Sequence, residues 1–170
     1  MHISLYILEG PWPGHLAVSA NPRGGSSLHT EVLAWRGERI NTVVSLLVPR
    51  EAAELDLEDE EEICILNQID FVSFPIGHRS VPSSYLPALE LMSGLDSRLS
   101  RGENVLIHSR QGVGRSAMIG AGLLIYRGID PKKAVQRVID VRGILVPETR
   151  EQLEWLGSIS SNMTVARPLG

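Results

Sequence analysis

The stretch Val105-Leu-Ile-His-Ser-Arg-Gln-Gly-Val-Gly-Arg-Ser-Ala-Met-Ile-Gly-Ala-Gly-Leu-Leu-Ile125 decides how this chain folds and where its site lies. Residues 105–107 are apolar and predict a short buried strand, and residues 115–126 predict an apolar helix. The polar loop between them contains Gly112 and Gly114, which let the backbone fold back because glycine takes positive φ without strain. Such a loop can direct N–H groups inward, and the helix adds free amides and the positive end of its dipole. The stretch therefore predicts an anion site, most naturally for phosphate.

The nine residues from His108 to Ser116, His-Ser-Arg-Gln-Gly-Val-Gly-Arg-Ser, also carry a family resemblance. They resemble the phosphate-binding loop of the cysteine-dependent protein tyrosine phosphatases and are most similar to that of the compact dual-specificity branch. The family signature is His-Cys, five residues, Arg, and then Ser or Thr. This sequence departs from the signature at one position, because Ser109 stands where the family has its nucleophilic cysteine.

Strands and helices alternate along the chain, which predicts an α/β fold with a central, largely parallel sheet flanked by helices. The phosphatase resemblance implies a three-layer α/β/α arrangement, and we expect residues 1–170 to form a single domain. The site then lies at the carboxyl end of a middle strand. The predicted strands are about 3–8, 15–19, 42–48, 69–74 and 105–107, and the predicted helices about 28–39, 51–55, 59–67, 84–100, 115–126, 131–141 and 147–159.

The bulk composition narrows the class of protein. The chain is 43% hydrophobic and 21% charged, as in ordinary globular proteins. A net charge of −4 argues against nucleic-acid binding, no apolar run approaches the roughly 18 residues of a membrane span, and no secretion signal is evident. We therefore expect a cytoplasmic protein with neither nucleic-acid nor membrane partners. The single cysteine, Cys64, is expected to be a small buried residue rather than a nucleophile.

The resemblance implies roles for the loop residues. Arg115 would contact two phosphate oxygens, which the planar guanidinium suits and a lysine would not. Ser116 would hydrogen-bond the nucleophile and ease its departure, although a serine at a helix start can also be a simple cap. We expect His108 to be buried and to organise the loop. The expected phosphate-binding set is Ser109, Arg110, Gln111, Gly112, Val113, Gly114 and Arg115.

The family also needs a general acid, an aspartate on a mobile loop about thirty residues before the nucleophile. Here His78 occupies that place, 31 positions before Ser109. A histidine can donate a proton near neutral pH, so His78 is the candidate acid; a surface histidine without a role remains the alternative. Asp70 is a poorer candidate because it begins a predicted buried strand, and Arg79 could add substrate affinity.

The acidic run from Asp56 to Glu62 tempts one to propose a metal site, but it is typical of a solvated face at a helix N-terminus. Residues 142–152 resemble the end of small dual-specificity phosphatases, where an Arg-Gly turn leads into a helix. Trp12 and Trp35 are expected to pack rather than to bind a ligand.

Ser109 decides the expected activity. A cysteine in this environment would exist as a thiolate, whereas a serine hydroxyl stays protonated without an adjacent base. The resemblance implies a tyrosine or dual-specificity phosphatase that hydrolyses phosphomonoesters of proteins or peptides through a phospho-enzyme, without cofactor or metal; a phosphate or sulfate ion should fit the loop. Either Ser109 is an engineered substrate-trapping change, which the otherwise intact loop favours, or the chain is a natural pseudophosphatase that binds phosphoproteins.

Overall fold

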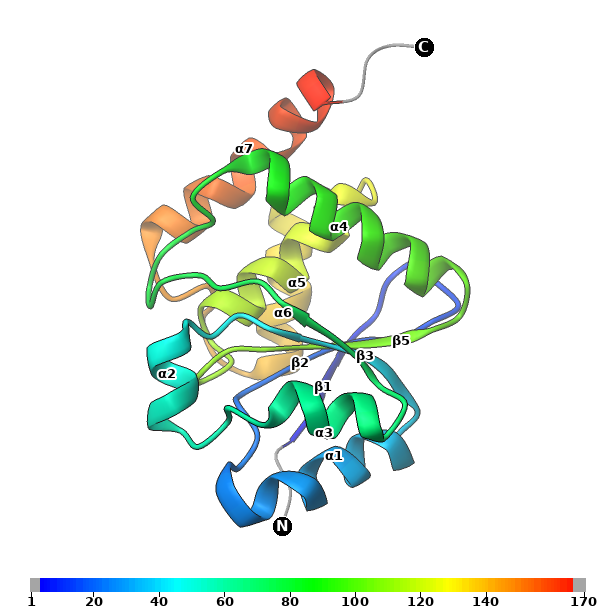
Figure 1. Cartoon of the computed structure of the whole chain (residues 1–170). Coiled ribbons are helices and arrows are strands. Elements are labelled where there is room, and N and C mark those ends of the chain that lie inside the picture. The colour runs from blue at the N-terminus through cyan, green and yellow to red at the C-terminus, as the bar shows by residue number, and fades with distance from the viewer. Residues whose placement is uncertain (1–3, 167–170) are drawn as a thin grey trace.

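The computed structural model describes residues 4–166, and five strands in this part of the chain form one sheet (Figure 1). The sheet order is β1-β2-β5-β3-β4, so β5 lies in the centre. β1 runs antiparallel to β2, and the other three pairings are parallel. The strands are β1 (Tyr6–Leu8), β2 (Leu16–Ser19), β3 (Ile40–Ser45), β4 (Asp70–Ser73) and β5 (Asn104–His108).

Helices cover both faces of this sheet, as Figure 1 shows, with α1 and α3 on one side and α4 to α7 on the other. α2 lies beside the loop that follows β5. The helices are α1 (Leu28–Gly37), α2 (Pro49–Glu54), α3 (Glu60–Leu66), α4 (Tyr85–Ser100), α5 (Arg115–Tyr126), α6 (Pro131–Arg142) and α7 (Arg150–Ala166), with a 3-10 turn, η1, at Gly25–Ser27.

The core has one part on each face of the sheet. On the α1 and α3 side, Val32, Trp35 and Cys64 pack beneath the strands. On the other side α5 is the central helix, and its residues from Arg115 to Ile125 are all buried. A helix that is apolar nearly all round belongs in the interior, because it has no polar face to present to water. The stretch from Val105 to Ile125, which forms most of β5 and most of α5, thus lies at the centre of the fold.

The α/β fold with a largely parallel sheet is confirmed, and each predicted strand and helix is found. α5 has the predicted ends, and the other elements have one or both ends shifted. Residue 3 of the first predicted strand lies outside the described residues, and β1 begins only at Tyr6. The last helix was predicted to begin at Pro147 and end near Ile159, which is wrong at both ends. The Val146–Pro147 peptide is cis, and α7 runs from Arg150 to Ala166.

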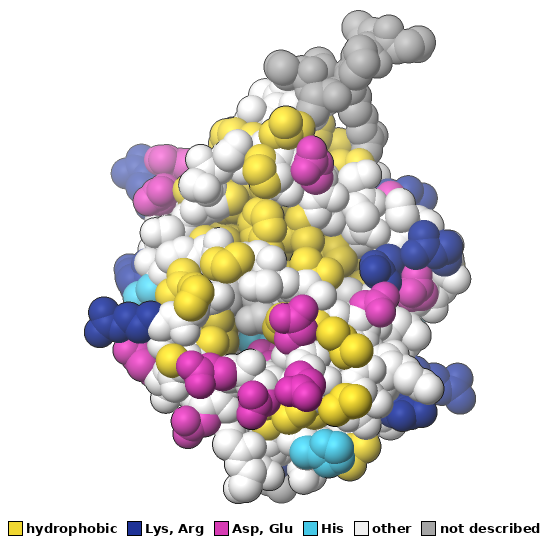
Figure 2. All heavy atoms as spheres, viewed as in Figure 1, with side chains coloured by type: hydrophobic (Ala, Val, Ile, Leu, Met, Phe, Trp, Pro, Cys, Tyr) yellow, Lys and Arg dark blue, Asp and Glu magenta, His cyan; other side chains and the backbone are white. Residues whose placement is uncertain are grey.

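The surface seen in Figure 2 carries acidic side chains over the region of α3. The exposed acids of the run before and within α3 are Asp56, Glu58, Asp59, Glu61 and Glu62. Among residues 4–166, no helix combines the length and apolar character needed to cross a membrane.

Candidate active site

The loop after β5 lies between the end of β2 and the last residue of α6, and both contact it. Gly112 has φ of +73°, and a Cβ there would lie 2.8 Å from the backbone of Ser19 and Ala20. On its other side Arg142 donates a hydrogen bond from Nε to the carbonyl oxygen of Gly112 over 3.0 Å. Only glycine therefore fits at this turn, which is held by the end of β2 and by α6.

The amides of this loop are available to a ligand. The amide of Ser109 donates to the carbonyl of Ser19 over 3.4 Å, which starts the turn. Among the residues that the structure describes, none accepts a hydrogen bond from the amides of residues 110–114. The loop leads into the N-terminus of α5, whose dipole adds to the attraction for an anion.

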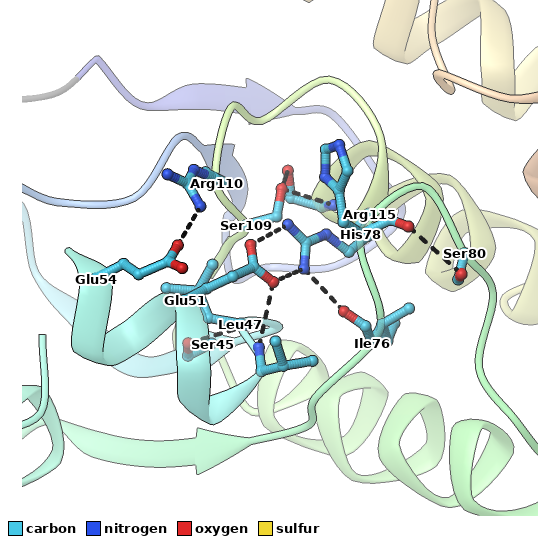
Figure 3. A network of polar contacts seen from close by, with 12 residues as sticks. Ser45, Leu47, Glu51, Glu54, Ile76, His78, Ser80, Ser109, Arg110 and Arg115 are labelled. Atoms are coloured by element: carbon cyan, nitrogen blue, oxygen red, sulfur yellow. Dashed lines mark hydrogen bonds and ion pairs between the residues drawn. The ribbon is translucent and has the colours of Figure 1, made fainter.

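Arg115 is buried, with 3% of its surface exposed, and is fixed in orientation. Its Nη1 and Nη2 donate to the two carboxylate oxygens of Glu51, each over 2.7 Å, and Nη1 also donates to the carbonyl of Ile76 over 2.8 Å (Figure 3). These bonds use both N–H groups of Nη1 and one of Nη2. The Nε–H and the second Nη2–H, which share one edge of the guanidinium, remain for two oxygens of an anion.

Glu51 was not recognised in the sequence as a site residue. It sits at the N-terminal turn of α2, where Pro49 is the first helical residue, and one oxygen accepts from the amide of Val48 over 3.5 Å. The hydrogen bond from Arg115, aided by its charge, lowers the pKa of Glu51 against the opposing effect of burial. Glu51 therefore stays ionised and holds Arg115 toward the loop.

Ser109, the first residue of the loop, is buried, with 2% of its surface exposed. Its hydroxyl donates to Oγ of Ser116 over 3.0 Å and accepts from the amide of Ser116 over 3.3 Å, and the Ser116 hydroxyl donates to the carbonyl of Ser19. No carboxylate or imidazole among the described residues contacts the Ser109 hydroxyl. A thiolate at this place would receive two hydrogen bonds, but the serine has no base to activate it.

His78 is exposed and lines the same pocket as Ser109 and Arg115. Figure 3 shows its ring beside these two residues, at the mouth of the loop. Val113, Gly114 and Glu148 are among the other residues of the pocket wall. Asp70 lies at the opposite end of β4 and bonds Arg98 over 2.7 Å, so it cannot reach this pocket.

The loop that carries His78 is tied to the beginning of α7. Arg79 forms an ion pair with Glu148 over 2.9 Å, and the buried side chain of Gln152 donates to the carbonyl of Ser80 over 3.1 Å. Gln152 also accepts from the amide of Thr149 over 3.2 Å. Arg79, predicted to add substrate affinity, is thus already paired with a carboxylate.

His108 is fully buried, and its Nε2 lies 2.6 Å from Oε1 of Glu60. The prediction of a solvated acidic run is therefore wrong for Glu60, which is 2% exposed, although its neighbours face water. Cys64 is buried as predicted, and burial, with the nearby charge of Glu60, raises the pKa of its thiol to about 12. No group of three or more His, Cys, Asp or Glu residues in the described part of the chain is arranged to hold a metal ion.

This fold, with this loop at the end of its central strand, is that of the cysteine-dependent protein tyrosine phosphatases, in their compact dual-specificity form. No protein-family model matches the sequence. Cyclin-dependent kinase inhibitor 3 of Rattus norvegicus is 33% identical over 85 residues, a match that covers 46% of this chain and 40% of the relative. The chain thus spans less than half of that relative's length in the comparison.

Two solved structures extend the likeness to nearly the whole chain. Kinase associated phosphatase with its catalytic-site cysteine replaced by serine gives a TM-score of 0.89 with 21% identity, covering 99% of both chains. Tk-PTP in its active form gives a TM-score of 0.74 with 26% identity, covering 93% of this chain and 97% of the other. The first of these structures has serine at its catalytic cysteine, as this chain has at position 109.

Proposed function

We propose that this protein is a phosphatase of the tyrosine or dual-specificity type whose loop binds phosphomonoesters, and that Ser109 leaves it able to bind them but nearly unable to hydrolyse them. The observation that carries the proposal is the free edge of Arg115. Glu51 and Ile76 fix the opposite side of the guanidinium, and Arg115 lines a pocket together with Ser109 and the loop.

The geometry supports an in-line displacement when a cysteine thiolate occupies position 109. The sulfur attacks phosphorus while the bond to the leaving oxygen breaks, and Arg115 with the loop amides stabilises the equatorial oxygens. An imidazolium at His78 donates its proton to the leaving oxygen. Water then hydrolyses the phosphocysteine, with the Ser116 hydroxyl stabilising the departing thiolate and neutral His78 accepting a proton.

The groove beside the pocket supports a phosphorylated protein or peptide as the substrate, and the compartment that we propose for it is the cytoplasm. Its volume is about 410 Å³, and its lining includes His78 and Arg110 of the site together with Arg50 and Glu54. Glu54 pairs with both arginines over 3.0 and 3.2 Å, which leaves little net positive charge. A highly phosphorylated inositol lipid would call for several unpaired cations.

The test is hydrolysis of p-nitrophenyl phosphate by the Ser109→Cys variant between pH 5 and 8. We expect turnover to rise by on the order of a thousandfold or more, because a thiolate replaces a protonated hydroxyl. Binding of inorganic vanadate or phosphate by the unmodified chain provides the parallel measurement. Folded Ser109→Cys protein with no turnover above blank and no oxyanion binding would refute the proposal.

A natural pseudophosphatase is the second candidate, because both positions that perform chemistry depart from the family. Ser109 replaces the nucleophile, and His78 stands in the place of the acid. The double variant Ser109→Cys, His78→Asp separates the two candidates. Turnover restored by Ser109→Cys alone supports a phosphatase blocked at one atom, whereas turnover that requires both changes supports a pseudophosphatase that has lost both functions.

A further inference from the structure

The groove beside the phosphate pocket contains two arginines that share one carboxylate. Oε1 of Glu54 accepts a hydrogen bond from Nε of Arg50 over 3.0 Å, and Oε2 accepts one from Nη1 of Arg110 over 3.2 Å. Figure 3 shows the bond between Glu54 and Arg110, which joins α2 to the loop after β5. The catalytic scheme above uses none of these three side chains.

This groove adjoins the phosphate pocket, because His78, Arg110 and Gln111 line both. An extended peptide advances about 3.3 Å per residue, so a residue one or two positions from the phosphorylated one can reach the groove. The charges of the groove therefore act on the neighbours of the phosphorylated residue in a bound peptide.

Two guanidiniums on either side of one carboxylate form an arrangement that suits an anion. Among the described residues, Arg50 and Arg110 make no ion pair other than those with Glu54. The bonds from Arg110 and Arg50 lower the pKa of Glu54, so its carboxylate is charged at neutral pH. The chain thus places an anion of its own where the two cations would otherwise bind one from the substrate.

We propose that Glu54 is a specificity-determining residue: its carboxylate occupies the anion site between Arg50 and Arg110, and the chain therefore selects phosphopeptides without a second phosphate beside the first. The inference rests on the proposed function and narrows its substrate class. A second phosphate must displace this carboxylate or lie next to it, where the two anions repel each other. Because Glu54 belongs to the same chain as both arginines, it competes at a high effective concentration.

Glu54→Gln tests the proposal in the unmodified Ser109 chain, which should bind phosphopeptides without turning them over. The probes are a peptide with one phosphotyrosine flanked by alanines and two versions that add a second phosphotyrosine two residues before or after it. Titration calorimetry at low ionic strength gives the ratio of their affinities, since salt screens exposed charges. For the unmodified chain we expect all three affinities to agree within about threefold, and Glu54→Gln should favour at least one doubly phosphorylated peptide by about tenfold.

Glu154→Gln is the matched control. Glu154 forms the same type of i,i+4 pair, with Arg150 over 3.1 Å, and it lines neither the pocket nor the groove. Its replacement should leave the affinity ratio unchanged. Adding Arg50→Gln and Arg110→Gln to Glu54→Gln should return the ratio to that of the unmodified chain, because the freed cations are then removed.

Three results would overturn the proposal. They are an unmodified chain that already prefers a doubly phosphorylated peptide tenfold, an affinity ratio that Glu54→Gln leaves unchanged, and a gain that persists without the two arginines. Glu54→Ala provides a second variant that removes the same charge if Glu54→Gln does not fold. Failure of the folded, unmodified chain to bind any of the three peptides would instead refute the proposed function.

Discussion

The loop 109–115 and the loop 75–82 form two sides of one pocket, yet they are built very differently. In the first, Ser109, Gly112, Gly114 and Arg115 are buried. Arg142 donates a hydrogen bond to Gly112, and Glu51 accepts two from Arg115. The second carries the exposed His78. It is held by the hydrogen bond from Gln152 to Ser80 and by the Arg79–Glu148 ion pair, in which the arginine side chain is 54% exposed. Burial thus distinguishes the part expected to bind phosphate from the part expected to donate a proton.

The departures from the family follow the positions of chemistry rather than those of binding. Ser109 changes one atom of the nucleophile, and His78 stands in the place of the acid, whereas His108, Arg115 and Ser116 match the family signature. Binding by amides and a guanidinium needs neither the thiolate nor the acid. From the difference between the two loops we therefore expect affinity for phosphate to be kept where turnover is lost.

The largest expected effect comes from Arg115→Lys, which tests whether the loop 109–115 binds the anion through the guanidinium. A lysine cannot contact both oxygens of Glu51 and present a second bidentate edge to phosphate. We expect vanadate affinity to fall by at least about a hundredfold, and the free energy of unfolding to fall by about 3 to 5 kcal/mol because Glu51 loses its partner. Titration calorimetry and urea unfolding measure these quantities. Retained affinity would show that the loop amides alone hold the anion.

A smaller effect is expected from His78→Asp in the Ser109→Cys background. This variant tests whether the residue at position 78 protonates the leaving group. An aspartic acid can protonate the leaving group below neutral pH, so we expect kcat for phosphotyrosine peptide to rise about ten- to a hundredfold near pH 5.5. His78→Ala is the control that removes the proton donor. If His78→Ala and the parent give the same kcat across pH 5 to 8, His78 is not the acid.

The sequence could predict the binding loop because its parts are consecutive. Five strands and seven helices in the described residues also follow from local periodicity, and the two glycines mark the turn. Glu51 and Glu60 could not be found in this way, because packing brings them to the loop from more than fifty and more than forty residues earlier in the chain.

A signal for Glu60 was nevertheless present within its own helix region. Leu57, before α3, and Glu60 and Cys64, within it, recur at helical spacing, and all three are buried. The uniform acidity of the run obscured that face, since neighbouring acids are normally solvated. Glu51 had a weaker signal, an acid at the start of a helix just after a strand next to the central one. Neither signal names the partner, which depends on tertiary packing.

The smallest expected effect concerns how acid weakens the bonds between Glu51 and Arg115. The bond to Arg115 lowers the pKa of Glu51 below its ordinary value of 4.5. Its contribution to stability is therefore fully present above pH 4.5 and is lost as the pH falls through the lower, folded-state pKa. We expect Glu51→Gln to lower the free energy of unfolding by about 1 to 3 kcal/mol at pH 7, and the difference from the unmodified chain to narrow below pH 4.5.

Glu54→Gln is the matched control for this experiment, because Glu54 also has a lowered pKa through Arg110 and Arg50 but lies in solvent. Water and salt screen its ion pairs, so we expect little change in stability at any pH. Urea unfolding at steps from pH 7 to pH 3 compares both variants with the unmodified chain. Parallel curves for Glu51→Gln and the unmodified chain across that range would show that the orientation of Arg115 does not depend on Glu51. The loop would then owe its order to its other contacts, among them the bond from Arg115 to Ile76, the bond from Arg142 to Gly112 and the bond from the Ser109 amide to Ser19.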